Sequence, residues 1–268
     1  MNNIIENIEK QLQGFIPPEE QRSMALWLLE ETTGLSRTDI LCGKGTKIIP
    51  ETETAIARLK QHEPIQYIFG HSDWRGMQLE VNPAVLIPRP ETSELVDWVL
   101  EDNPNESHSL LDAGTGSGCI AIAIKKARPL WQVTALDISP EALAIAQRNG
   151  KRQEVDIIWQ KADMLHLPNT LHADILVSNP PYILKSEQVT MDDNVLCHEP
   201  HQALFVEDND PLRFYRALAQ QHLAPMLYFE INPLMVTPMQ EMLHKEGYST
   251  VTVRHDMEGK ERFIRATR

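Results

Sequence analysis

Residues 173–182, which read ADILVSNPPY, decide the fold of this chain. The first half, ADILV, is a short run of apolar and β-branched residues that is typical of a buried parallel strand. After Ser178 comes a polar corner, in which Pro180 and Pro181 restrict the backbone beside Asn179. Ligands of open α/β sheets bind at the carboxyl ends of strands, so the stretch predicts both a strand and a binding site.

The corner is rich in groups that accept hydrogen bonds. Asn179 has a side-chain amide, Tyr182 adds an aromatic ring, and the two prolines lack N–H donors that would compete for nearby carbonyl oxygens. These groups indicate a site for a planar NH2 group. The alternative interpretation is a plain strand-ending turn, because Asn-Pro commonly begins a turn and Pro-Pro commonly ends a strand.

The composition excludes several classes of protein. The 268 residues are 42% hydrophobic and 24% charged, an ordinary globular balance, and the net charge of −13 gives no general attraction to nucleic acid. Cys42, Cys119 and Cys197 lie far apart and have no zinc-type spacing, so we expect no metal site. The amino terminus lacks a signal-peptide pattern, and no stretch approaches ~20 apolar residues. We therefore expect a cytoplasmic protein without a membrane partner.

The chain divides into three parts by pattern. Residues 1–64 read as short helices separated by prolines, and we expect a helical substrate-docking domain there. Residues 65–87 are aromatic and aliphatic around two glycines, which predicts a β-hairpin connector. From residue 88 to 268, strand and helix patterns alternate. Expected strands are 109–111, 132–136, 155–159, 173–177 and 226–230, with a terminal hairpin at 249–254 and 262–266. The prediction is a doubly wound α/β sheet with an antiparallel last strand.

Four polar features follow four successive strands of this sheet. The first is a glycine-rich loop, DAGTGSG at 112–118, with the spacing G-x-G-x-G in place of the dinucleotide pattern G-x-G-x-x-G. Such a loop lets a ligand approach the backbone and the free N–H groups of the next helix. Asp137 ends the next strand, where a carboxylate can accept both hydroxyls of a ribose, and Asp163 follows the third. With the Asn-Pro-Pro-Tyr corner, they favour a nucleotide-like ligand over four unrelated turns.

The motifs LDAGTGSGCIAIAI, ALDISPEALAIAQRN and DILVSNPPY resemble those of class I S-adenosylmethionine-dependent methyltransferases, which have a Rossmann-like fold. PIQYIFG, LIPRPET and DMEGKERF, with EP at Glu199 and AL at Ala203, closely resemble the release factor glutamine methyltransferases, the PrmC or HemK family. The likeness covers nearly the whole chain. Two residues depart from the pattern: Ser93 stands where an acid often follows PET, and Asn232 stands where glycine usually follows Glu-Ile.

The resemblance implies methyl transfer from S-adenosylmethionine to a glutamine amide nitrogen by a methyltransferase domain over 88–268. The implied cofactor residues are Gly114, Thr115, Gly116, Ser117 and Gly118 for the methionine portion, Asp137 for the ribose, Asp163 and Met164 for the adenine, and Asn179. The implied substrate residues are Asn179, Pro180, Pro181 and Tyr182, of which Asn179, Pro180 and Tyr182 are expected to be catalytic. Amide and carbonyl oxygens of Asn179 and Pro180 would accept the two substrate N–H bonds and stabilise the positive charge that develops on nitrogen, and Tyr182 would pack on the amide.

The same motif occurs in enzymes that methylate the amino group of adenine, because that group is also a planar NH2 on an sp2 carbon. The negative net charge argues against nucleic acid. We therefore expect a monomeric enzyme that methylates the glutamine in the Gly-Gly-Gln loop of peptide-chain release factors. The alternatives are a ribosomal-protein glutamine, the adenine amino group, and a nucleotide-binding module without methyl chemistry.

Overall fold

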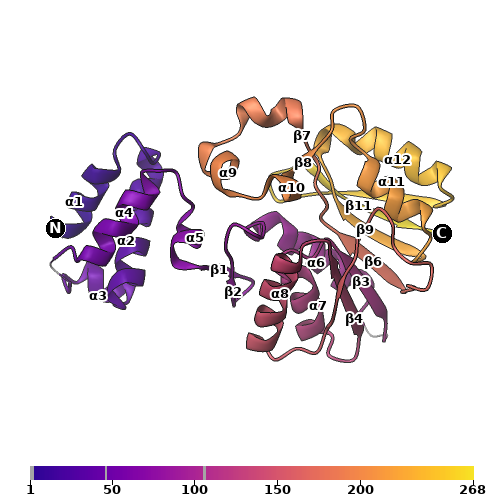
Figure 1. Cartoon of the computed structure of the whole chain (residues 1–268), viewed down its shortest axis with the longest axis horizontal. Helices are drawn as coiled ribbons and strands as arrows, with labels where there is room; N and C mark the ends of the chain where they lie inside the picture. The colour runs from indigo at the N-terminus through magenta and orange to yellow at the C-terminus, as the bar shows by residue number, and fades with distance from the viewer. Residues whose placement is uncertain (1–2, 46, 105–106) are drawn as a thin grey trace. The chain divides into compact units, whose positions relative to one another are not determined.

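The computed structural model describes residues 3–45, 47–104 and 107–268 and contains two compact units. The first unit comprises Met1–Gly70 with Asp192–His198, and the second comprises His71–Met191 with Glu199–Arg268. Both are drawn in Figure 1. The division of the chain at residues 64 and 87 stays a prediction.

The first unit is helical. Its helices are α1 (Asn3–Leu12), α2 (Pro18–Thr33), α3 (Arg37–Leu41), α4 (Pro50–Leu59), α5 (Ile65–Phe69) and α9 (Asp193–His198). Proline begins α2 and α4. At the first position of a helix the N–H group, which proline lacks, would have no acceptor within the helix. The side chain of Ser36 caps α3 by accepting a hydrogen bond from the backbone N–H of Asp39. Apolar residues of α1, α2 and α4, such as Ile8 and Leu28, are fully buried together.

The predicted β-hairpin covers only part of the expected stretch. Strands β1 (His71–Trp74) and β2 (Met77–Glu80) pair antiparallel, which confirms the hairpin. The prediction is wrong for Ile65–Phe69, which forms α5. The carbonyl of Pro64 accepts hydrogen bonds from the N–H groups of Tyr67 and Ile68, and Gly70 ends the helix in the left-handed region.

The second unit is built on a seven-stranded sheet with the order β10-β11-β9-β6-β3-β4-β5. Its strands are β3 (Ser109–Ala113), β4 (Gln132–Asp137), β5 (Ile158–Lys161), β6 (Ile175–Ser178), β9 (Met226–Glu230), β10 (Thr250–His255) and β11 (Glu261–Thr267). The first five are mutually parallel, and the last strand, β11, is antiparallel to both neighbours. This confirms the doubly wound sheet with an antiparallel last strand.

One strand begins later than expected. The sequence predicts the third strand at 155–159, whereas β5 begins at Ile158. The backbone N–H of Val155 instead donates to the carbonyl of Gly150 at the end of the preceding helix, and Glu154 has a left-handed φ of 56°. The chain therefore completes a helix-ending turn at Glu154 and Val155, and the strand begins only after it.

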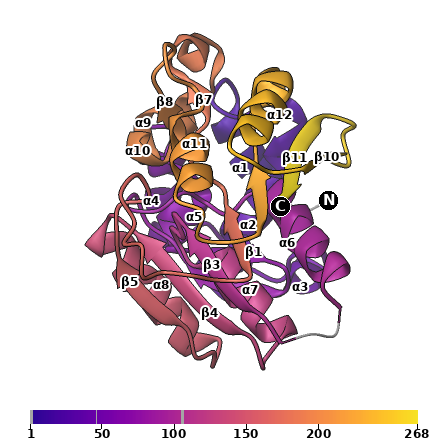
Figure 2. The same cartoon turned by 90° about the vertical axis from the view of Figure 1, so that its right-hand side faces the viewer.

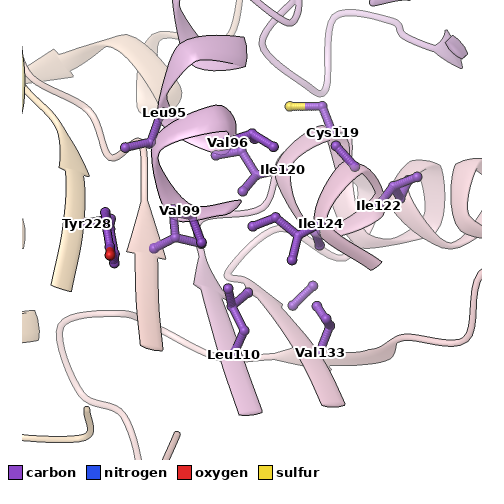
Figure 3. Close-up of a cluster of buried hydrophobic side chains, with 14 of the residues drawn as sticks. Leu95, Val96, Val99, Leu110, Cys119, Ile120, Ile122, Ile124, Val133 and Tyr228 are labelled. Atoms are coloured by element: carbon purple, nitrogen blue, oxygen red, sulfur yellow. The ribbon is translucent and has the colours of Figure 1, made fainter. Parts of the chain in front are cut away.

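Helices cover both faces of the sheet (Figure 2). Helices α6 (Pro90–Asp102) and α7 (Cys119–Ala127) pack their leucine, valine and isoleucine side chains on one face, as Figure 3 shows. Helix α8 (Pro140–Arg152) packs beside α7. Helices α11 (Arg213–Gln220) and α12 (Val236–Lys245) cover the other face. Leu110 and Leu111 on β3 belong to different clusters, which is why the strands read as continuous apolar runs.

Residues 183–211 form elements that the sequence pattern does not predict. This region contains a two-stranded parallel sheet of β7 (Ile183–Leu184) and β8 (Phe205–Val206), with the short helix α10 (His201–Leu204) before β8. A 3-10 helix covers Lys185–Thr190. Among the described residues, no helix has both the length and the apolar character needed to cross a membrane.

Candidate active site

A cavity of about 610 Å³ opens at the carboxyl ends of β3, β4 and β6 in the second unit. Its volume is typical of a site for a cofactor or other small ligand. The expected residues that line it are Gly114, Thr115, Gly116, Ser117, Asp137, Asp163, Met164, Asn179 and Pro181. Three others, Gly118, Pro180 and Tyr182, are not among its lining residues. The strand ends thus bring together most of the residues that the sequence singles out.

The glycine-rich loop needs glycine for two different reasons. Gly116 has a φ of 54°, and a Cβ built there would meet nothing within 4 Å, so this position opens onto free space. Gly118, with a φ of 84°, is the N-cap of α7, and a Cβ there would lie 3.1 Å from atoms of Ala146, Ile122 and Trp159. Gly116 is therefore needed for its left-handed backbone, while Gly118 also allows helix α7 to pack closely.

Asp112, for which the sequence predicts no role, anchors the glycine-rich loop through hydrogen bonds. Its Oδ2 accepts hydrogen bonds from Thr115 Oγ1 at 2.6 Å and from the N–H of Ala121 at 3.2 Å. Its buried Oδ1 has no hydrogen-bond partner within the described residues. Burial raises the pKa of the Asp112 carboxyl to about 7, against the opposing effect of the Thr115 hydrogen bond.

This raised pKa predicts how stability changes with pH. Asp112 binds a proton more tightly in the folded state, so its contribution to the free energy of unfolding is lost as pH rises from its ordinary value of 3.8 to about 7. We expect urea denaturation at pH 5 and 7 to show a smaller decrease for Asp112→Asn than for the wild type. The difference is at most ~1.4 kcal/mol per pH unit. The exposed Asp156→Asn variant is the control, and equal decreases in wild type and Asp112→Asn would contradict the prediction.

Asp137 joins two backbone segments at the cavity wall. Its Oδ2 accepts the N–H of Gly116 and its Oδ1 accepts the N–H of Ser139, each at 2.9 Å. Ser139 in turn caps helix α8. Burial raises the pKa of Asp137, while the backbone hydrogen bonds lower it. Each carboxylate oxygen retains a further lone pair for a ligand hydroxyl.

The segment after β5 is fixed by its own hydrogen bonds. Asp163 Oδ1 accepts the N–H of Leu165 at 2.9 Å, and the carbonyl of Met164 accepts Nε2 of Gln221 at 3.0 Å. The side chain of Gln221 also accepts the N–H of Leu167. These hydrogen bonds hold Asp163 and Met164 at the cavity wall.

The Asn-Pro-Pro-Tyr corner follows β6 directly. Ser178 Oγ donates to the carbonyl of Ala113 at 2.6 Å, which ties the ends of β6 and β3 together. Asn179 and Pro181 reach the cavity, and Pro180 is buried beside them. The ring of Tyr182 packs on the apolar cluster under α11 and α12, and its hydroxyl donates to Glu230 Oε1 at 3.0 Å. The structure thus places Tyr182 behind the corner.

Two further residues connect to the corner. Thr92, near the start of α6, accepts Nδ2 of Asn179 at 3.1 Å and donates from Oγ1 to Glu230 Oε2 at 2.7 Å. Their exposed fractions are 3% for Thr92 and 1% for Glu230. Burial raises the pKa of Glu230, while the hydrogen bonds from Thr92 and Tyr182 lower it. The motifs LIPRPET and Glu-Ile-Asn mark these segments in the sequence, but they do not show that the two side chains meet.

The segment before α6 is held by a buried acid. Glu199 accepts a hydrogen bond from Arg89 Nη2 and another from the N–H of Ile87. The Glu199 side chain is 1% exposed, and Arg89 lines the cavity. Removing one partner of such a buried pair is costly, so this ion pair fixes the segment that carries Thr92.

Both departures from the family pattern make local contacts. Asn232 donates from Nδ2 to the carbonyl of Tyr182 at 3.3 Å and to Glu187, and its Oδ1 accepts the N–H of Leu234. Asparagine here supports the backbone of the corner, which glycine could not do. Ser93 accepts hydrogen bonds from Arg75 through its hydroxyl and its carbonyl.

These residues suit S-adenosylmethionine. Within one cavity, Gly116 leaves open space and the carboxylate of Asp137 offers two acceptor oxygens. The turn at Asp163 and Met164 forms part of the cavity wall. Among the described residues, no group of three or more histidine, cysteine, aspartate or glutamate side chains could hold a metal ion.

Solved structures support the fold. The human methyltransferase 10 domain containing protein superposes with a TM-score of 0.54 at 18% identity, over 72% of this chain and 89% of that one. A methyltransferase from Pyrococcus furiosus gives a TM-score of 0.52 at 18% identity, with the same coverage. At this level of identity the likeness shows a shared methyltransferase fold and nothing finer.

Sequence comparisons identify the family. A family model described as the PrmC N-terminal domain matches residues 4–70, and one described as a methyltransferase small domain matches residues 91–204. The release factor glutamine methyltransferase of Bacteroides thetaiotaomicron is 42% identical over an alignment of 280 residues that covers 100% of each chain. That of Flavobacterium psychrophilum is 40% identical over 95% of this chain and 94% of the relative. Such identity over full-length relatives shows that the chain belongs to the release factor glutamine methyltransferase family.

Proposed function

We propose that this protein transfers a methyl group from S-adenosylmethionine to the side-chain amide nitrogen of the glutamine in the Gly-Gly-Gln loop of peptide-chain release factors. The observation that carries the proposal is the 42% identity with a release factor glutamine methyltransferase over the whole of both chains. The cavity at the strand ends and the Asn-Pro-Pro-Tyr corner beside it support the same reaction.

The residues that we propose for the cofactor are among those that line the cavity. The glycine-rich loop from Gly114 to Ser117 would hold the methionine portion, Asp137 the ribose, and Asp163 with Met164 the adenine. When bound, S-adenosylmethionine supplies an electrophilic methyl group on a sulfonium. Gly118, which does not line the cavity, would contribute by allowing α7 to pack closely against Ala146.

The substrate amide needs help, because its nitrogen lone pair is delocalised into the carbonyl. In our proposal, Oδ1 of Asn179 and the carbonyl oxygen of Pro180 accept its two N–H bonds. These acceptors orient the nitrogen and stabilise the positive charge that it gains. The methylated nitrogen then loses its proton readily, so no strongly basic residue is needed. Tyr182 would support the corner from outside the cavity, since its hydroxyl donates a hydrogen bond to Glu230.

A methylation assay tests the proposal. The purified protein is incubated with methyl-labelled S-adenosylmethionine and, separately, with a purified release factor, its loop Gln→Ala variant, a ribosomal-protein fraction and duplex DNA. We expect label on the wild-type release factor alone. Label on DNA would overturn the proposal, because the acceptor would then be a nucleic acid in spite of the net charge of −13. Equal label on the loop variant would also overturn it, because the methylated group would then not be the loop glutamine. The monomeric state and the cytoplasmic location stay predictions.

A further inference from the structure

A chain of hydrogen bonds runs inward from the cavity wall at Asn179. Nδ2 of Asn179 donates to Thr92 Oγ1 at 3.1 Å, and Thr92 Oγ1 donates to Glu230 Oε2 at 2.7 Å. The hydroxyl of Tyr182 donates to the other carboxylate oxygen, Oε1, at 3.0 Å. The chain links the loop after β6 with helix α6 and the last residue of β9. It therefore connects a cavity residue to a buried acid through one hydroxyl.

With Glu230 ionised, the direction of these hydrogen bonds is fixed. An ionised carboxylate only accepts, so the single hydroxyl proton of Thr92 is used on Glu230. Thr92 Oγ1 can then only accept from Asn179, which requires the NH2 end of the amide to face it. The oxygen end, Oδ1, is consequently directed away from Thr92.

Burial is the largest influence on Glu230 and raises the pKa of its carboxyl, and the neighbouring donors act against it. Burial and nearby Glu91 raise the pKa of Glu230, whereas Thr92, Tyr182 and the positive charge of Arg262 lower it. The hydroxyl of Tyr215 donates to the backbone carbonyl of the same residue at 2.8 Å. Within the described residues, Oε2 and Oε1 of Glu230 accept their hydrogen bonds from the hydroxyls of Thr92 and Tyr182, which suits an anion.

We propose that Thr92 is a positioning residue that sets the orientation of the Asn179 amide, so that Oδ1 and not Nδ2 is presented to the substrate. This inference rests on the proposed function. The two ends of an asparagine amide have nearly the same shape, so packing alone cannot choose between them. A flipped amide would set its NH2 group against the NH2 group of the substrate glutamine, donor against donor. Thr92 prevents this because its own donor is committed to Glu230.

Two substitutions at one position isolate the hydroxyl. Thr92→Val keeps the shape of the buried side chain but removes Oγ1, and Thr92→Ser keeps the hydroxyl. We expect Thr92→Val to lower kcat about tenfold, the scale of one lost hydrogen bond, with little change in the Kd for S-adenosylmethionine. Thr92→Ser should retain near wild-type kcat. If the valine variant does not fold, Thr92→Ala takes its place.

A second measurement reads the amide itself and needs no catalysis. In protein labelled with 15N-asparagine, the side-chain signals of Asn179 are assigned by their loss in Asn179→Ala. We expect one amide proton to be protected from exchange in wild type and Thr92→Ser and unprotected in Thr92→Val, because its acceptor is gone.

The outcomes separate the two proposals. A wild-type kcat in Thr92→Val, an equal loss in Thr92→Ser, or unchanged Asn179 signals in Thr92→Val would each overturn the positioning role. A parallel loss of cofactor affinity in Thr92→Val would also overturn it, since the effect would then come from a deformed cavity. If the wild type methylates no release factor, the proposed function fails, and the amide signals still decide the role of Thr92.

Discussion

Replacing Asn179 with alanine is expected to lower kcat about a hundredfold or more, the usual scale for removing a preorganised group that stabilises transition-state charge. Asn179 lies at the cavity wall, and Thr92 already holds its Nδ2 at 3.1 Å, so its Oδ1 needs no rearrangement to accept a substrate N–H. The backbone of the corner does not depend on this side chain, because Ser178 and Asn232 hold it from either side. The Kd for S-adenosylmethionine should therefore stay near the wild-type value.

The prediction is tested by measuring both kcat and the Kd for S-adenosylmethionine in Asn179→Ala. Steady-state methylation of a release factor gives kcat, and calorimetry with S-adenosylmethionine gives Kd. Asn169→Ala is the matched control, because Asn169 is an exposed asparagine of the same unit that does not line the cavity. Near wild-type turnover in Asn179→Ala would show that the amide is not the acceptor that acts on the substrate.

The sequence predicts the edge of the site because the geometry of parallel strands is simple. Once β3, β4 and β6 are recognised as parallel neighbours, the residues that follow them have to meet at one edge of the sheet. Asp137 and Asn179 are therefore placed correctly at the cavity from strand patterns alone. Strand starts are less predictable, since the late start of β5 depends on the turn that ends α8.

The contacts of the Asn-Pro-Pro-Tyr corner with the core could not be predicted, because no local sequence pattern encodes them. Thr92 and Glu230 are separated by 138 residues and meet only because α6 packs against the end of β9. Tyr182 illustrates the same limit: its place in the motif suggests a substrate contact, but its ring packs on the hydrophobic core and its hydroxyl donates to Glu230. A sequence motif identifies such residues, but only tertiary packing shows whether their side chains face the cavity or the core.

Replacing Asp137 with alanine is expected to weaken S-adenosylmethionine binding roughly a hundredfold, because hydrogen bonds to a charged acceptor contribute ~1.5–3 kcal/mol each. In the proposed site its carboxylate accepts the ribose hydroxyls. The substitution also frees the N–H groups of Gly116 and Ser139, which it holds at 2.9 Å. Loss of affinity thus has two sources, ligand contacts and loop order, and both act in the same direction. Titration calorimetry with the purified protein measures it.

Asp137→Asn separates a need for negative charge from a need for shape. Both carboxylate oxygens of Asp137 already accept a backbone N–H, so an asparagine would have to turn its NH2 group toward either Gly116 or Ser139, donor against donor. We therefore expect the asparagine variant to bind S-adenosylmethionine nearly as weakly as Asp137→Ala, although it has almost the native shape. Asp156→Ala removes the same charge from an exposed site and should bind normally. Wild-type affinity in Asp137→Asn would mean that the carboxylate neither orders the glycine-rich loop nor holds the ribose, and the ribose would then have to be assigned to another side chain of the cavity.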